Sequence, residues 1–74
     1  MNYIIIEAQT TNGVTTLTNP VVKETFNLAE QEFHTKVAAA AVSSVPLHSV
    51  TMLTESGRMV KYEAYTHGEE AAEE

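Results

Sequence analysis

The chain has 74 residues, 43% of them hydrophobic, with no cysteine and a formal net charge of −6. This length accommodates a single domain. The lack of cysteine excludes disulfides, thiolate metal sites and cysteine nucleophiles. Four Lys and Arg residues against ten acidic ones argue against nucleic-acid binding, because phosphate contacts need clustered cations.

The negative charge is concentrated near the C-terminal end. All ten acidic residues are glutamates, and Glu69, Glu70, Glu73 and Glu74 lie in the last six positions. We therefore expect one domain over residues 1–68, followed by a solvated acidic tail over residues 69–74. No segment resembles a secretory signal, and no apolar run approaches the roughly 20 residues that span a bilayer. We expect a cytosolic protein that does not contact membranes.

The first 18 residues predict a hairpin of two strands. Asn12-Gly13 is a strong signal for a type I′ turn, because both central residues of that turn need a positive φ. Pairing about this turn places Ala8 opposite Leu17 and Thr10 opposite Thr15. Asn19-Pro20 ends the second strand, and residues 21–26 form a connection to which we assign no structure.

A helix is predicted from Leu28 to about Ser44. Asn27 is a suitable N-cap, and Glu30 at the third helical position completes an arrangement like a capping box. Pro46 ends the helix, since the residue before a proline avoids helical geometry. The spacing of small and apolar residues predicts one buried face, which consists of Ala29, Phe33, Val37, Ala40, Ala41 and Ser44.

The last hairpin is predicted to join residues 47–54 and 58–67. A two-residue loop would pair Met52 with Lys61, whereas a three-residue loop with a left-handed Gly57 would pair Met52 with Val60. We prefer the second register because it separates polar and apolar residues better. The element order ββαββ predicts an α+β fold, in which one helix packs on a face of a four-stranded antiparallel sheet.

Two features of the pattern predict self-association. Residues 37–42 are apolar on every side of the helix, so part of them cannot face the sheet. The preferred register also points Tyr3, Ile5, Leu53, Met59 and Tyr65 away from the helix, where they would expose a large apolar surface. We expect a homo-oligomer whose interface includes Ala38, Ala39, Val42, Ile5 and Met59. The alternative is that the alanines are merely good helix formers and tolerate exposure.

The candidate chemistry favours binding over catalysis. His34, His48 and His67 have no compact ligand spacing, and no nucleophile motif is present, so we expect no metal, no cofactor and no enzymatic activity. Aromatic and basic side chains could instead line a pocket at a subunit junction for a small, nucleotide-like anion. This tentative set is His34, Lys61, Tyr62, Tyr65 and His67. The alternative is that these residues are ordinary strand formers.

Residues 30–49, followed by Gly57 and by residues 61–67 (KYEAYTH), are similar to a group of short proteins of phages, prophages and metagenomes of gut Gram-positive bacteria. The likeness extends from the first strand to His67. The group has no assigned activity, so the resemblance implies a setting: small acidic oligomers there often sequester a defence signal or block a host defence protein.

These observations together predict a non-enzymatic, homo-oligomeric binding module of the phage accessory type. Its target would be a nucleotide-like ligand or a host protein in the bacterial cytosol. The alternatives are a structural or packaging component of a phage assembly and, more remotely, a metal-dependent hydrolase.

Overall fold

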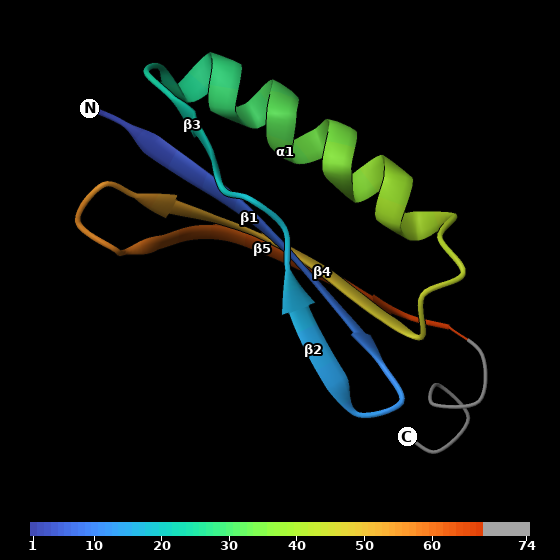
Figure 1. The fold of residues 1–74 in the computed structure, drawn as a ribbon. Coiled ribbons are helices and arrows are strands. Elements are labelled where there is room, and N and C mark those ends of the chain that lie inside the picture. Colours follow the sequence, from blue (N-terminus) through green and yellow to red (C-terminus); the bar gives the residue numbers. More distant parts are fainter. Residues whose placement is uncertain (68–74) are drawn as a thin grey trace.

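The computed structural model describes residues 1–67, which form a five-stranded antiparallel sheet with one helix on one of its faces (Figure 1). The elements in chain order are β1 (Tyr3–Thr11), β2 (Val14–Leu17), β3 (Val21–Lys23), α1 (Phe26–Ala41), β4 (Leu47–Thr54) and β5 (Met59–Thr66). The expected α+β class is confirmed, but the sheet has five strands instead of four. The predicted acidic tail, residues 69–74, lies outside the described residues.

Strand β1 is the centre of the sheet because three strands pair with it. β2 and β3 share one edge of β1, β4 pairs along its other edge, and β5 pairs with the far edge of β4. β3 is the strand that the sequence pattern does not predict. It has three residues, too few to show an alternating pattern, and it is a strand because Val21 and Val22 pair with Ile5 and Ile4.

The first hairpin agrees with the prediction in turn and register. Asn12 and Gly13 have φ angles of 54° and 80°, as a type I′ turn requires. Ala8 pairs with Leu17 and Thr10 with Thr15, and the hydroxyl oxygens of Thr10 and Thr15 lie 2.8 Å apart.

Helix α1 begins two residues earlier than predicted, and Asn27 is not its N-cap. Thr25 takes that position with an extended backbone, and its side-chain oxygen accepts a hydrogen bond from the backbone N–H of Leu28 at 3.3 Å. The first turn then brings Phe26 edge-on to Tyr3, with ring centroids 5.7 Å apart. This contact with β1 explains why the helix starts before Asn27.

The helix ends at Ala41 with Val42 as its C-cap, three residues before the predicted end at Ser44. Its buried face is as expected for Ala29, Phe33 and Ala40, and Val37 is half-buried against the core. The prediction is wrong for Ala41 and Ser44, which are both exposed. α1 has 16 residues, and the described residues contain no helix long and apolar enough to cross a membrane.

The last hairpin combines the preferred loop with the other register. Gly57 has a φ of 93° and its N–H donates to the Thr54 carbonyl at 2.8 Å, as the three-residue loop requires. Leu53 pairs with Met59, but an irregularity follows, and Met52 pairs with Lys61. Val60 is the extra residue of this bulge, so the predicted pairing of Met52 with Val60 is wrong.

The strand registers assign each strand residue to one of two faces. The helix side holds the core, which consists of Ile5, Ala29, Phe33, Ala40, Val50 and Met52. Tyr3, Ile5 and Tyr65 also face the helix, so the expectation that they point away from it is wrong. Ile5 pairs with Met52, and both are fully buried under α1. Leu53 lies on the opposite face, as expected, and Met59 pairs with it.

The face turned away from the helix carries no charged strand residue. We call it the open face; by register it comprises Ile4, Ile6, Ala8, Thr10, Thr15, Leu17, Val22, Leu47, Ser49, Thr51, Leu53, Met59, Tyr62, Ala64 and Thr66. The charged strand residues Glu7, Lys23, Lys61 and Glu63 all lie on the helix side. This distribution is the reverse of the usual one, in which the uncovered face of an antiparallel sheet is polar.

Candidate functional site

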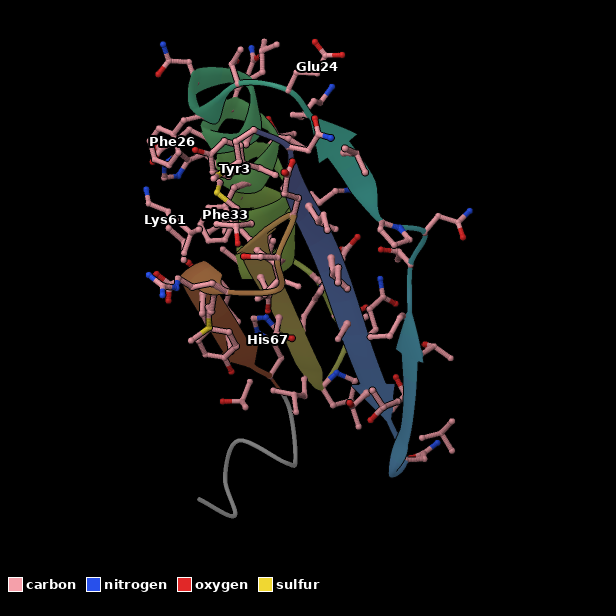
Figure 2. All side chains as sticks on the ribbon, turned by 90° about the vertical axis from the view of Figure 1, so that its left-hand side faces the viewer. Tyr3, Glu24, Phe26, Phe33, Lys61 and His67 are labelled. Atoms are coloured by element: carbon pink, nitrogen blue, oxygen red, sulfur yellow. The ribbon has the colours of Figure 1, made fainter. Side chains whose placement is uncertain are left out.

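The predicted ligand residues divide into three separate places. His34 and Lys61 meet at Glu30: the His34 Nε2 lies 3.3 Å from Glu30 Oε1, and the Lys61 ammonium donates to Glu30 Oε2. The same ammonium lies 5.8 Å from the centroid of the Phe33 ring (Figure 2). Lys61 is therefore used within the subunit, between the helix and β5.

The hydrogen bond from Lys61 lowers the pKa of the Glu30 carboxyl below its ordinary value of 4.5, and His34 adds a smaller effect in the same direction. Glu30 therefore remains ionised at neutral pH and neutralises the lysine. A free anion would have to compete with this carboxylate for Lys61.

Tyr65 and His67 lie at the other end of the last hairpin. Their rings stack with centroids 6.3 Å apart, and His67 Nε2 donates to the carbonyl of Ala40 at 3.1 Å, in the last turn of α1. Tyr62 belongs to the open face, on the opposite side of the sheet from Lys61. The five predicted ligand residues thus do not converge, and residues 1–67 enclose no pocket.

A buried polar cluster that sequence reasoning missed lies under the helix. Glu7 on β1 accepts a hydrogen bond from His48 Nε2 on β4, and its other oxygen lies 3.8 Å from the ammonium of Lys36 on α1. Lys36 also lies 3.5 Å from Glu32 Oε2. The His48 side chain is 5% exposed, and its Nδ1 is buried without a hydrogen-bond partner.

The sequence signal for this cluster is the alternation of side chains along β1. Glu7 alternates with Tyr3 and Ile5, so any register that buries Ile5 under the helix also directs Glu7 there. Residues 1–67 form no pocket beside the cluster. The cluster links β1, β4 and α1.

The three histidines stay apart from one another. His34 is exposed on the helix, His48 is buried under it, and His67 contacts its C-terminal turn. Within the described part of the chain, no group of three His, Asp or Glu side chains is arranged to hold a metal ion.

The predicted interface residues also separate. Ala38, Ala39 and Val42 are exposed on the helix, and Val42 is 87% exposed. Met59 is 60% exposed and belongs to the open face. Ile5 is fully buried between the sheet and the helix, so its assignment to an interface is wrong.

The open face is the apolar sheet surface that the sequence predicted, but only Leu53 and Met59 of the five residues assigned to it lie there. Its end nearest the 55–58 loop is the more apolar one and presents Val22, Ile4, Leu53 and Met59 side by side across the sheet. The next row is Ile6, Thr51 and Tyr62. The end nearest the first turn carries the hydroxyls of Thr10, Thr15 and Thr66 beside Leu47. Small residues, Ala8, Ser49 and Ala64, separate the two ends.

Comparison with protein-family models, with curated proteins and with solved structures found no match for this chain. The candidate functional surface is therefore defined by the chain's own residues: an open face that is apolar at one end, hydroxyl-bearing at the other and uncharged throughout.

Proposed function

We propose that this chain is a non-enzymatic binding module that acts as a homo-oligomer, in which two copies pack their open faces against each other. The observation that carries the proposal is the absence of any charged strand residue from that face. Leu17, Val22, Met59 and Tyr62 are each more than half exposed there. Contiguous apolar surface of this kind is typical of an interaction site.

A second copy suits this face because of the distribution of charge. Residues 1–68 contain six glutamates and four basic residues, which gives −2, and the tail adds −4. Two copies therefore carry net charge of the same sign, and they repel each other at long range. The open face is the broad surface on which copies can approach without opposing like charges, and a two-fold axis uses the same face twice.

The size of the face supports the same occupant. Four neighbouring strand positions spaced by about 4.8 Å, each with about eight residues of 3.3 Å rise, span about 500 Å². Two such faces bury about 1,000 Å² together before side-chain relief is counted, which reaches the lower limit for a specific interface. Face-to-face packing of two sheets is the arrangement of β-sandwiches, in which side chains of both inner faces interdigitate.

The proposed target of the assembled module is a protein. A small anion is less favoured because Lys36 and Lys61 already pair with glutamates and because the tentative ligand residues do not converge. The resemblance to phage proteins extends the proposal to a protein of the host cell as the target.

The open-face proposal is tested by the mass of the particle in solution. Sedimentation equilibrium at micromolar concentration should give at least about twice the 8.1 kDa of one chain for the wild type, and Ile6→Lys should lower that mass. Ile6→Lys places a charge in the centre of the open face of each copy and should weaken association by at least about 100-fold, since about 3 kcal/mol corresponds to that change. Far-UV circular dichroism should be unchanged, because Ile6 lies outside the buried core.

Ala39→Arg is the matched control, because it adds a charge to the exposed face of the helix instead. It should leave the mass unchanged. A wild-type monomer would overturn the proposal, and so would dissociation by Ala39→Arg with no effect of Ile6→Lys, which would move the contact to the helix.

A further inference from the structure

The two edges of the sheet differ in their capacity to pair with another strand. One edge is formed by β2 and β3, which are short and are separated by a segment that contains Pro20. The other edge is β5, which has eight residues, contains no proline and pairs with β4 alone among the described strands. Unpaired N–H and C=O groups along such an edge are a template for a further strand.

The hydrogen-bond pattern shows which residues of β5 present these groups outward. The N–H of His67 donates to the carbonyl of Pro46 at 2.6 Å, so residue 67 faces β4. Antiparallel pairs alternate between bonded and non-bonded positions, so Lys61, Glu63 and Tyr65 also direct their backbone groups to β4. The N–H and C=O groups of Tyr62, Ala64 and Thr66 therefore point away from the sheet.

The opposite charges of Lys61 and Glu63, on either side of Tyr62, favour pairing of this edge with an antiparallel copy of β5. A two-fold axis through Tyr62 pairs residue 62 with itself and places Lys61 of each copy directly opposite Glu63 of the other. Axes through Lys61 or Glu63 would oppose like charges. An axis through Ala64 would place Glu63 opposite Tyr65, without a cation.

Glu63 and Lys61 differ in whether they already have an ion-pair partner within the described residues. Glu63 is exposed and forms no ion pair within residues 1–67. Lys61 contacts Glu30, but its ammonium has three donors, so it can keep that contact and also donate to a second carboxylate held opposite it by the strand pairing. Positions 61 and 63 form a non-hydrogen-bonded pair in this register, where opposing side chains lie closest. Two equivalent Lys61–Glu63 contacts would form, one on each side of the axis.

We propose that the edge of β5 is a second self-association surface, on which two copies pair antiparallel about Tyr62 through reciprocal Lys61–Glu63 contacts. The pairing joins two sheets side by side and leaves their open faces on the same side, so it uses a surface distinct from that of the proposed open-face contact. The bulge at Val60 bends the strand and limits the ladder, so the edge contact is the shorter of the two.

A charge exchange tests the edge pairing. In an Ile6→Lys background, which removes the open-face contact, Glu63→Lys should weaken self-association at least about tenfold, because like charges then oppose each other twice. Lys61→Glu should do the same. An equimolar mixture of the two variants should form a heterodimer in native mass spectrometry, since each Lys then opposes a Glu.

A second experiment leaves residues 61 and 63 intact. The chain has no cysteine, so Tyr62→Cys in the same background introduces one thiol per copy, and on exposure to dissolved oxygen, which accepts the two electrons, the two thiols should form a disulfide-linked dimer. Ala64→Cys is the matched control and should not crosslink, because the two thiols would be displaced along the strands beyond the Cα separation of about 7 Å that a disulfide allows.

The edge pairing is overturned if mixing the charge variants gives no heterodimer, or if Ala64→Cys crosslinks as readily as Tyr62→Cys. Failure of the open-face proposal has a different signature, because the Ile6→Lys substitution alone would then leave the wild-type mass unchanged.

Discussion

Glu7 is a charged residue that contacts both the sheet and the helix. Its carboxylate accepts from His48 and lies near Lys36, and the side chain is only 14% exposed. Removing one member of a buried pair leaves the other without its partner, which costs more than the pair itself contributes. Substituting Glu7 or His48 alone should therefore destabilise the fold more than substituting both.

Glu7→Leu should lower the free energy of unfolding by about 3 kcal/mol, because His48 then loses its buried acceptor. The double variant with His48→Leu should lose at least about 1 kcal/mol less than the sum of the two single variants. Urea unfolding followed by far-UV circular dichroism at one protein concentration measures all three differences. Additive losses would mean that the pair is not coupled.

The contact between Glu30 and Lys61 makes stability depend on pH. The pKa of Glu30 is lowered in the folded state, so the contact stabilises the fold above the ordinary carboxyl value of 4.5. This stabilisation is lost progressively as the pH falls from 4.5 to below the lowered pKa of Glu30 in the folded state. We expect the difference in melting temperature between the wild type and Lys61→Met to be constant from pH 6 to 7.

The same difference should shrink between pH 4.5 and pH 2, as Glu30 becomes protonated. Lys61→Met retains the aliphatic stem near Phe33, so packing changes little and the comparison isolates the charge. A difference that persists at pH 2 would show that Lys61 stabilises the fold by its stem alone.

At the scale of the elements, the first turn of α1 is capped by one hydroxyl. Thr25 accepts from the N–H of Leu28, although Asn27 is the stronger cap by residue type. Thr25→Ala should lower the free energy of unfolding by about 1 kcal/mol. Asn27→Ala is the matched control and should change it by less than about 0.5 kcal/mol, as exposed helical positions do. If urea unfolding showed a larger loss for Asn27→Ala than for Thr25→Ala, Asn27 would be the N-cap.

The sequence predicted those elements well whose structure depends on neighbouring residues alone. Asn12-Gly13 determines both its turn and the pairing of Ala8 with Leu17, because a two-residue loop leaves one register. β3 and the bulge at Val60 depend on strands distant in the chain. Val21 is extended because it pairs with Ile5, and Met52 pairs with Lys61 because of one inserted residue. Neither fact is visible in a short window.

The candidate site was predictable in kind but not in composition. The strands contain more apolar residues than one core can hold, so an apolar surface opposite the helix was predictable. Which residues form it depends on the strand register, which the sequence leaves open, and Ile5 is in the core instead. Shifting one strand by one residue exchanges its two faces, which is why Tyr3 and Tyr65 were assigned to the wrong side. Glu7 was missed for the same reason.

At the scale of the whole molecule, the two proposed self-association surfaces are perpendicular to each other. Edge pairing extends the sheet in its own plane, whereas the open face stacks sheets. Two-fold contacts on both surfaces would close into a tetramer if their axes intersect and would continue as a fibre if they do not. Four of the ten glutamates lie in residues 69–74, and their charge adds repulsion between copies that opposes unlimited growth.

The central position of β1 has a consequence for synthesis on the ribosome. β1 is made before β4, which pairs with residues 3–10 of β1 and follows about 40 residues later. At roughly 5–20 residues per second, β1 waits roughly 2–8 s for that partner. During this interval the run Ile4, Ile5 and Ile6 has only β2 and β3 as possible pairing partners.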